Sequence, residues 1–353
     1  MSSNRKGAGF AECPIPIAER EEILLGHGSG GKLTARLIEQ IIVPAFRNPA
    51  LEALDDQAIV SLGGARLAFT TDSYVITPIF FPGGDIGELA VNGTVNDLAM
   101  GGAIPQVLSL AFILEEGLPV SDLQRIVDSA RRAAEGAGVR VVTGDTKVVG
   151  KGSGDKVFIN TSGIGVVPAG IDLSSCNVRP GDAILLSGSI GDHGIAIMST
   201  REGLEFEGDL CSDTAALHDL ASAMLAASPR IHAMRDPTRG GLAATLVEIA
   251  SRQRLGMEVS ERAIPVRDTV RGACEILGLD PMLVANEGKL VAFVPDNASE
   301  AVLEAMRRHP LGRDAARIGI VTEAHPGFVL VKTPIGGDRV LDLPLGESLP
   351  RIC

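Results

Sequence analysis

The sequence predicts two domains that each pack helices against a β-sheet, an α+β to α/β fold, and three observations lead to this prediction. The chain has 353 residues, which is more than a single hydrophobic core usually requires. Strand-like and helix-like patterns alternate from about residue 58 to residue 167, and a second alternating unit of similar length follows. The turn-forming run Arg179-Pro180-Gly181-Asp182 separates the two units.

We therefore expect four segments: a flexible N-terminal arm at 1–22, a first domain at 23–178, a second domain at 179–332 and a mobile tail at 333–353. The arm has two early basic residues but no apolar run after them, so it does not resemble a signal peptide. The tail is rich in proline and glycine, which favours an extended chain, and it ends in Cys353.

The first domain is expected to begin with a glycine-rich loop at 26–32 and a helix at 34–46 whose apolar residues fall on one face. Five strands and two helices should follow: strands at 58–62, 66–71, 106–114, 139–143 and 156–167, and helices at 85–100 and 121–135. The second of these helices carries a capping-box pattern, Ser121 with Gln124, at its start. Together these elements predict a sheet with helices on one face.

The second domain is expected to follow the same plan. We predict a strand at 183–187, a glycine-rich turn at 188–194, and helices at 193–199, 214–227 and 241–252. Strands and a helix then alternate to about residue 342, and no sequence repeat relates the two halves.

The composition argues against several classes of protein. The formal net charge is −12, Trp is absent and Tyr74 is the only tyrosine, so we expect no nucleic-acid binding. The longest clearly apolar stretch, at 107–114, is too short to span a bilayer, so we expect no membrane insertion. The five cysteines are scattered and form no CxxC pair, which argues against disulfide and zinc frameworks. A soluble cytoplasmic protein is therefore expected.

Four aspartates of the first domain are candidate ligands for Mg²⁺ and phosphate. Asp56 precedes a predicted strand, whereas Asp72 and Asp145 end strands, where ligands usually bind in layered α/β folds. Asp97 falls within the apolar stripe of the helix at 85–100, so it should point toward the sheet, where a bare carboxylate needs a cation or hydrogen-bond donors. Such carboxylates suit Mg²⁺, which keeps phosphate oxygens as partners. The alternative is that all four are ordinary turn and cap residues.

The glycine-rich loop matches only the beginning of a nucleotide-binding P-loop. Gly26, four further residues and Gly31-Lys32 fit that pattern, but Leu33 stands where a P-loop needs Ser or Thr for the metal. We therefore reject a Walker-type NTPase. Backbone N–H groups of such a loop can still bind phosphate, and a flexible entry to the helix is the alternative.

Other residues are candidates for chemistry, each with a plainer alternative. Lys147 could reach a phosphate, although a lone lysine is more often solvated. The run 235–241 begins a helix that could bind an anion. Glu287 lies between two apolar strands as a candidate base or as a hairpin-turn residue. Cys353 ends a tail that can extend about 60 Å, so its sulfur could visit another enzyme and then its own active site, or be an accidental terminal thiol.

Several motifs, in order along the chain, resemble the HypE family of hydrogenase maturation factors. They are His27-Gly28-Ser29-Gly30-Gly31, Thr70-Thr71-Asp72-Ser73, Phe81-Pro82-Gly83-Gly84-Asp85, Asn92-Gly93-Thr94-Val95-Asn96-Asp97-Leu98-Ala99, Gly191-Asp192-His193-Gly194, Asp236-Pro237-Thr238-Arg239-Gly240-Gly241-Leu242, Asn286-Glu287-Gly288-Lys289 and Pro350-Arg351-Ile352-Cys353. The resemblance runs from about Leu24 to the last residue and leaves residues 1–22 outside it.

This resemblance implies the PurM-like fold of the aminoimidazole ribonucleotide synthetase superfamily, in which strands of the first domain build a β-barrel across a homodimer. It also implies an ATP-dependent carbamoyl dehydratase. The carbamoyltransferase HypF would place a carbamoyl group on the terminal cysteine, and the enzyme would dehydrate it to a thiocyanate. The cyano group would then pass to the HypC–HypD iron carrier as a cyanide ligand for [NiFe] hydrogenase.

The resemblance alone assigns the residue roles. Cys353 would carry the reacting group, Glu287 would take the amide proton and Lys147 would stabilise the transferred phosphoryl group. Four aspartates would hold Mg²⁺, and these together with four more residues would bind ATP: Asp56, Asp72, Asp97 and Asp145, then Gly28, Gly30, Gly31 and Asn96.

Two other functions stay open from the sequence. A relative that phosphorylates a free small molecule, such as a kinase or a selenophosphate synthetase, would not need Cys353. For the selenium enzyme, Cys13 lies too far before the glycine-rich loop and has no adjacent lysine. A non-enzymatic carrier would bind nucleotide and dock partners through its tail.

Overall fold

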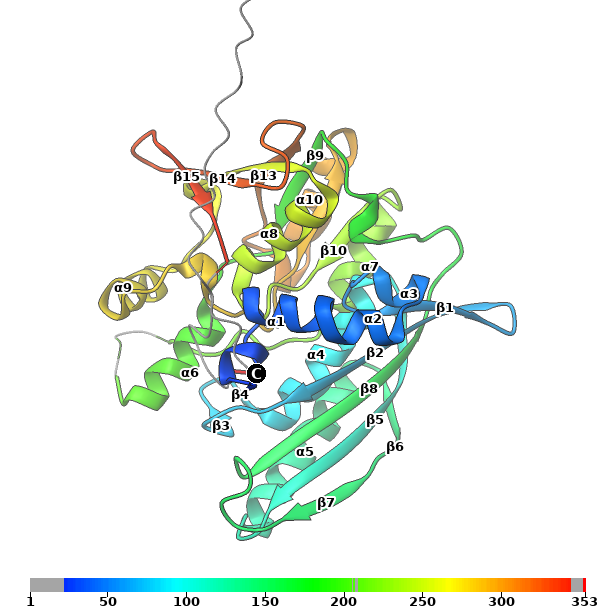
Figure 1. The fold of residues 1–353 in the computed structure, drawn as a ribbon, viewed down its shortest axis with the longest axis vertical. Coiled ribbons are helices and arrows are strands. Elements are labelled where there is room, and N and C mark those ends of the chain that lie inside the picture. Colours follow the sequence, from blue (N-terminus) through cyan, green and yellow to red (C-terminus); the bar gives the residue numbers. More distant parts are fainter. Residues whose placement is uncertain (1–21, 205, 207–208, 344–351) are drawn as a thin grey trace, which may run out of the picture.

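The structure, a computed structural model, describes residues 22–204, 206, 209–343 and 352–353. Two layered α/β units lie side by side, the first-domain sheet in the lower half of Figure 1 and the second-domain sheet in the upper half. The predicted tail segment 344–351 and nearly all of the predicted arm lie outside the described residues. Within the described part of the chain, no helix has the length and apolarity needed to cross a membrane.

The N-terminal part is a series of short helical segments. They are η1 (Leu25–Gly28), α1 (Lys32–Leu37), the π-helical η2 (Ile38–Ile42), α2 (Val43–Phe46) and α3 (Pro49–Glu52). The helix predicted at 34–46 is therefore present, but its middle turn is wider. The N–H of Val43 bonds to Ile38. Pro44 has no N–H with which to continue the tighter α-helical pattern.

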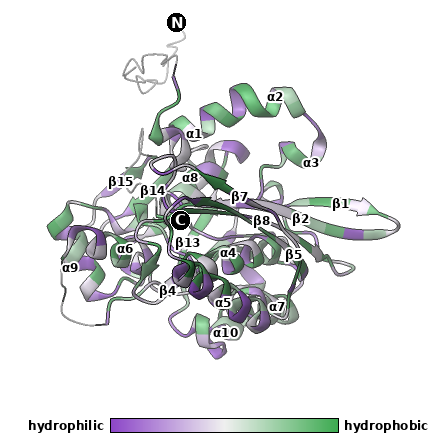
Figure 2. Ribbon diagram, turned by 90° about the horizontal axis from the view of Figure 1, so that it is seen from below, coloured by the Kyte–Doolittle hydropathy of each residue, from purple (hydrophilic) through white to green (hydrophobic). Residues whose placement is uncertain are grey.

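The first domain contains a mixed sheet with the strand order β1-β2-β8-β5-β6, and β7 also pairs with β5. Its strands are β1 (Ala58–Leu62), β2 (Ala65–Tyr74), β5 (Ile104–Glu115), β6 (Arg140–Thr143), β7 (Thr146–Val149) and β8 (Val157–Val166). The helices α4 (Ile86–Met100) and α5 (Val120–Gly136) cover one face, as predicted (Figure 2). A small hairpin of β3 (Phe80–Phe81) and β4 (Gly84–Asp85) precedes α4.

One detail of these helices differs from the prediction. Helix α5 begins at Val120 with Pro119 as its N-cap and no side-chain cap bond, so the predicted capping box of Ser121 and Gln124 is wrong. Proline can occupy this position because the first N–H groups of a helix have no partner inside it. Helix α4 is buried on nearly every side, because it also contacts the second domain.

The second domain contains a seven-stranded sheet with the order β10-β12-β9-β13-β11-β14-β15. Its strands are β9 (Asp182–Leu186), β10 (Ala233–Arg235), β11 (Gly256–Ser260), β12 (Val291–Pro295), β13 (Ala316–Thr322), β14 (Val329–Lys332) and β15 (Asp338–Leu341). Its helices are α6 (Asp192–Glu202), α7 (His218–Ala227), α8 (Gly241–Gln253), α9 (Asp268–Leu277) and α10 (Asp296–Arg308), and short 3₁₀ turns are η3 (Ser175–Asn177), η4 (Glu261–Ala263), η5 (Pro281–Leu283) and η6 (Pro310–Gly312). The predicted helix at 214–227 begins only at His218.

The first part of the tail predicted at 333–353 forms a strand. Strand β15 pairs antiparallel with β14, and Leu341 is buried in the second hydrophobic core of this domain. Pro334, Gly336 and Gly337 form a turn closed by a bond from the N–H of Gly337 to Thr333 Oγ1. Residues 333–341 therefore pack against the second domain, and the predicted boundary at 332 stays a prediction.

One hydrophobic cluster crosses from the first domain into the second. It includes Leu98 and Leu108 of the first domain and Leu185, Leu220 and Met224 of the second. Because burial of apolar surface is the main stabilising contribution to folding, this shared cluster fixes the relative position of the two domains. Residues from both domains can therefore form one site.

The close approach of α4 and α5 yields a test of this packing. A β-carbon at Gly87 would collide with the carbonyl oxygen of Ile126 in α5, whereas nothing lies within 4 Å of a β-carbon at Gly136. We expect Gly87→Ala to lower the free energy of unfolding by about 1–3 kcal/mol through overpacking. The matched variant Gly136→Ala should leave it unchanged or raise it by up to about 1 kcal/mol. Thermal and denaturant unfolding measure both, and equal effects of the two substitutions would contradict the packing described.

Candidate active site

Five acidic side chains from both domains converge where the domains meet. They are Asp56 before β1, Asp72 in β2, Asp97 in α4, Asp236 after β10 and Glu287 before β12. The hydroxyl of Thr70 lies 2.8 Å from Asp97 Oδ2 and 2.8 Å from the carbonyl oxygen of Asp56, which joins three elements at this point. The sequence predicted Asp56, Asp72, Asp97 and Glu287 as site residues, and the structure brings these four together.

The convergence of carboxylates shifts their protonation. Burial raises the pKa of Asp56, Asp97 and Glu287 well above their ordinary values, and repulsion from neighbouring carboxylates adds to it. For Asp236 the same cause, burial, raises the pKa to about 6. Without a cation, this cluster therefore holds protons at a pH where exposed carboxyl groups have lost them.

Two arginines partly offset this negative charge. Arg235 Nε lies 2.6 Å from Asp56 Oδ1, and its guanidinium also lies 3.9 Å from Glu248. Arg239 lies 3.8 Å from Asp72 Oδ1 and donates a hydrogen bond of 3.4 Å to the carbonyl of Gly28 in the glycine-rich loop. The two cations come from one short segment at the start of α8. The sequence analysis singled this segment out as a helix start that could bind an anion.

The glycine-rich loop lies against this segment. Gly30 has a φ of 77°, and a β-carbon there would come within 2.9 Å of Arg239 Cβ, so only glycine allows the close approach. The N–H of Gly30 donates to Thr34 Oγ1 at 3.0 Å. The predicted loop residues Gly28, Gly30 and Gly31 are therefore next to the acidic cluster, and one of their N–H groups already has a partner.

Glu287 is held in place by bonds to its backbone. Its N–H donates to Asp213 Oδ1 at 3.0 Å, and Lys289 Nζ lies 2.9 Å from Asp213 Oδ2. The amide of Asn96 donates to the carbonyl of Glu287 at 3.2 Å and accepts from the N–H of Leu217 at 2.7 Å. The sequence assigned Asn96 to the nucleotide. In the structure its amide is engaged with the backbone of the second domain, so it positions Glu287.

The end of the chain lies in this site. Ile352 is 4% exposed and forms an antiparallel bridge with Ile76, and the N–H of Val75 donates to Cys353 O at 3.2 Å. Burial raises the pKa of the Cys353 thiol well above its ordinary value; Arg239 lowers it and Glu287 raises it further. The terminal sulfur is therefore within the electrostatic field of the acidic cluster.

Asp145 and Lys147 lie elsewhere. They are exposed near β6 and β7, where Lys147 Nζ lies 3.0 Å from Asp145 Oδ2 and keeps the pKa of that carboxyl low. Among the described residues, neither side chain bonds to a member of the acidic cluster. Their predicted roles remain predictions, and a single copy of the chain does not bring them to the other site residues.

The acidic cluster suits a cation that arrives with a ligand. Asp56 Oδ2 and Glu287 Oε1 are buried and have no hydrogen-bond partner within the described part of the chain. In that same part, no three side chains of His, Cys, Asp or Glu form a ready-made metal cage. Mg²⁺ does not require such a cage, since it usually binds one or two carboxylates together with phosphate oxygens and water. The residues therefore fit a magnesium–nucleotide complex better than a resident structural metal.

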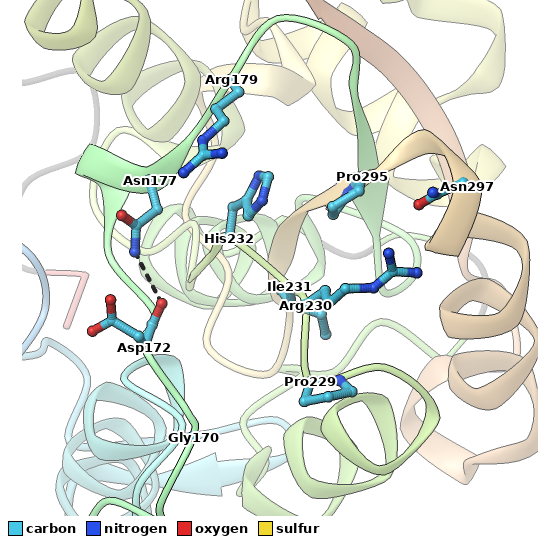
Figure 3. Close-up of a pocket in the computed structure, with 10 residues that line it drawn as sticks. All are labelled: Gly170, Asp172, Asn177, Arg179, Pro229, Arg230, Ile231, His232, Pro295 and Asn297. Carbon is cyan, nitrogen blue, oxygen red and sulfur yellow. Dashed lines mark hydrogen bonds between the residues drawn. The ribbon is translucent and has the colours of Figure 1, made fainter.

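A separate cavity of 480 Å³ lies on another side of the domain junction. Figure 3 shows Arg179, Arg230 and His232 around it, together with Asn177, whose amide donates to the carbonyl of Asp172 at 2.9 Å. His232 is itself paired with the buried carboxylate of Asp182 at 2.8 Å. None of the predicted site residues lines this cavity, so it is distinct from the candidate active site.

Comparison with known proteins agrees with this arrangement. Family models described as "AIR synthase related protein, N-terminal domain" and "AIR synthase related protein, C-terminal domain" match residues 54–167 and 179–332. The fold and the site between its domains thus define a two-domain, PurM-like protein of the AIR synthase-related class. The PurM-like fold predicted from the sequence is confirmed, while a barrel across a homodimer remains a prediction.

Individual relatives show which family within this class the chain resembles. The protein of Azotobacter vinelandii named carbamoyl dehydratase HypE is 59% identical over 327 residues, which cover 93% of this chain and 96% of that protein. The chain belongs to the HypE family. A solved structure of HypE in complex with ATP has a TM-score of 0.79 and 51% identity, covering 94% of this chain and 100% of that chain. A HypE–HypF complex contains a chain with a TM-score of 0.83 and 48% identity, covering 87% and 99%.

The raised pKa values predict a pH dependence of stability. The folded state holds a proton on Asp236 that the unfolded chain releases. The contribution of this group to stability is therefore full below the unfolded pKa of 3.8 and is lost as the pH rises through the folded value of about 6. We expect Asp236→Asn, in EDTA and without nucleotide, to remove about 3 kcal/mol of this loss between pH 4 and 7, since one pKa unit corresponds to about 1.4 kcal/mol. Thermal unfolding across this pH range is the measurement.

Asp145→Asn is the matched control. Lys147 lowers the pKa of Asp145, so this exposed carboxylate contributes stability that rises with pH. Its removal therefore cannot reduce the loss of stability that is expected between pH 4 and 7. Parallel pH profiles for the wild type and Asp236→Asn would show that the cluster is not protonated in the folded state.

Proposed function

We propose that this protein is an ATP-dependent carbamoyl dehydratase that converts a carbamoyl group on the thiol of its own Cys353 into a thiocyanate. The product would supply the cyanide ligand for [NiFe] hydrogenase. The main support is the location of the terminal sulfur among buried acidic groups at the domain junction. The names of relatives such as the Azotobacter vinelandii carbamoyl dehydratase HypE support the same reaction.

The proposed reaction consumes one ATP for each water that the carbamoyl group formally loses. The carbamoyl oxygen attacks the γ-phosphorus, so an O–P bond forms, the bond to ADP breaks and one amide proton is lost. The second amide proton then leaves as the C–O bond breaks, which gives a C≡N triple bond and inorganic phosphate. Phosphorylation is needed because the oxygen of an amide is a poor leaving group, whereas phosphate is a good one.

Glu287 is the proposed base for the amide protons. Burial raises its pKa well above the ordinary value, which makes the Glu287 carboxylate a stronger base than an exposed one. Its Oε1 is buried without a hydrogen-bond partner among the described residues, so it is available to accept a proton. Lys147 is the proposed partner of the transferred phosphoryl group, and since it lies outside the cluster in one chain, this role would require a second copy or a movement of β7.

Asp56, Asp72 and Asp97 are the residues that would hold Mg²⁺, with Asp145 proposed as a fourth ligand. When bound, the ion would neutralise the charge that develops during phosphoryl transfer. The three clustered carboxylates would also lose their mutual repulsion, which stabilises their charged form. The glycine-rich loop would then cover the nucleotide and exclude water.

The thiol needs a second location for its other reaction. A thiolate is the nucleophile that accepts an acyl-type group, and burial beside Glu287 and Asp72 keeps the docked thiol protonated. Acceptance of the carbamoyl group would therefore occur with the tail outside the site. The partner for this step is proposed to be the carbamoyltransferase HypF, with which a similar HypE chain was solved in complex, and the cyano group is proposed to pass to HypC–HypD.

Homodimerisation is proposed through the uncovered face of the first-domain sheet. Phe69 and Ile164 are cross-strand neighbours on this face and are 45% and 38% exposed, and Val166 beside them is 40% exposed. Contiguous exposed apolar side chains on a sheet commonly mark an interface. Cytoplasmic residence remains an expectation of the same proposal.

Intact-mass measurement separates the dehydratase from a carrier and from a kinase acting on a free substrate. After addition of the carbamoyltransferase, carbamoyl phosphate and ATP, the chain should first gain one carbamoyl group and then lose one water, with release of ADP. A carrier would stay carbamoylated. Cys353→Ser should abolish both mass changes, and ATP turnover by that variant at the wild-type rate would point to a free-substrate enzyme.

Substitution of the proposed base should block the second step alone. We expect Glu287→Gln to gain the carbamoyl group normally and to lose water about 10²–10⁴ times more slowly, because the proton acceptor is missing. The control Glu135→Gln changes an exposed glutamate of α5, paired with Arg131 at 2.7 Å, and should behave as the wild type. Single-turnover mass spectrometry measures both rates, and normal dehydration by Glu287→Gln would remove Glu287 from the mechanism.

A further inference from the structure

The motif Gly191-Asp192-His193-Gly194 begins α6 and has no part in the chemistry proposed above. His193 is fully buried, and its ring contacts the end of the chain. Its Nε2 lies 2.7 Å from the carbonyl oxygen of Ile352, and its Nδ1 lies 2.7 Å from Ser212 Oγ. The ring of Phe81 packs at right angles against the imidazole, with centroids 5.7 Å apart. The imidazole is thus enclosed between the tail and the rest of the protein.

The partners of His193 define which nitrogen carries the proton. A carbonyl oxygen can only accept, so Nε2 must donate its N–H to Ile352. The N–H of Thr214 donates to Ser212 Oγ at 3.1 Å, which leaves the Ser212 hydroxyl free to donate to Nδ1. Burial also lowers the pKa of His193, which favours this neutral ring. The Thr214 N–H, the Ser212 hydroxyl and the His193 Nε2–H therefore donate in series, and the last of them donates to the backbone of the docked tail.

The same part of the chain also holds the proposed base. The N–H of Gly191 donates to Asn286 Oδ1 at 2.7 Å, and the N–H of Gly194 donates to the carbonyl of Ala285 at 3.1 Å. A β-carbon at Gly194 would collide with Val284, so α6 begins directly against this segment. Asn286 and Ala285 immediately precede Glu287. The imidazole of His193 and the carboxyl group of Glu287 are therefore fixed on one unit.

The two domains hold different parts of the tail. The first domain buries the side chain of Ile352 beside Ile76 and bonds to Cys353 O through the N–H of Val75. His193 is the second-domain side chain that bonds to the Ile352 carbonyl. This bond is independent of the side chain at position 352, because it is made to the backbone.

We propose that His193 is a positioning residue that holds the docked tail through the Ile352 carbonyl and thereby sets how often the group on Cys353 reaches Glu287. This inference rests on the proposed function and extends it, because it names the side chain that stabilises the docked position of the tail. His193 does not touch the reacting atoms. Without its donor, the docked and undocked states still interconvert, but the docked state is less populated.

The accessibility of Cys353 in the full-length protein tests this proposal. N-ethylmaleimide labelling, followed residue by residue by mass spectrometry, should modify Cys353 far more slowly than Cys176, which is exposed. His193→Leu replaces the imidazole with an apolar side chain of similar size and so removes the Nε2 donor. It should speed labelling of Cys353 roughly three- to tenfold, as expected for one lost hydrogen bond. His193→Gln keeps an N–H donor near the Nε2 position and should stay within about twofold of the wild type.

One internal comparison and one replacement variant decide the outcome. Cys274 is buried in α9 and reports unfolding, so its protection must persist in any variant that is interpreted. If Cys274 becomes reactive in His193→Leu, Ser212→Ala takes its place, because it removes the hydroxyl that fixes the ring and should also speed labelling of Cys353. Unchanged Cys353 labelling in the folded variant would overturn the proposal.

Kinetics separate this proposal from the proposed function. In the folded donor-free variant, carbamoylation at limiting carbamoyltransferase, which uses the undocked tail, should speed up by the same factor as Cys353 labelling. Single-turnover dehydration should slow only by the loss of docked population. Faster labelling with an unchanged carbamoylation rate would overturn the positioning role. A wild-type protein that never loses water would refute the dehydratase, yet the labelling result would still report whether His193 holds the tail.

Discussion

The site depends on one electrostatic constraint: buried carboxylates from two domains share a space in which they cannot all be ionised. Burial raises the pKa of Asp56, Asp97, Asp236 and Glu287, and the charge of Asp236 raises the pKa of the other three further. Such a site is stable only when it holds protons, arginines or a bound cation. Arg235 and Arg239 supply part of the positive charge, and the remaining negative charge favours a bound cation. This balance explains why a polyanionic nucleotide and a divalent cation are expected to bind together.

Each domain contributes different residues to the site, and the shared hydrophobic cluster holds the two sets together. The first domain presents its carboxylates on a strand and a buried helix, and the second presents Asp236, Arg239 and Glu287 on loops next to its strands. Asn96 joins the two sides, because its amide bonds to the backbone of Leu217 and Glu287. Loops are usually mobile, but these loops are fixed by buried polar bonds, which gives the proposed base a defined position.

The terminal cysteine has opposite requirements in its two proposed reactions. Inside the site the thiol is neutral, which prevents the sulfur from acting as a nucleophile beside a nucleotide. Outside the site it is free to ionise. The few contacts of the tail end, namely the buried Ile352 side chain and its backbone bonds, are compatible with reversible docking.

Much of the fold could be predicted from local sequence, because strand alternation and helix periodicity depend on neighbouring residues. The strands at 58–62 and 139–143 and the helices at 85–100 and 241–252 were predicted closely, and the Asp97 carboxyl does face the sheet. The π-turn near Pro44 and the capping of α5 by Pro119 were missed although both arise from local residues, whereas strand β15, in the segment predicted as tail, depends on its pairing with β14. By itself, the sequence determined the two-domain plan, the acidic candidates and the candidate cysteine. Only the tertiary structure decided that Asp236 joins the cluster, that Asp145 and Lys147 lie apart from it and that His193 binds the tail, because distances between residues far apart in sequence arise only from packing.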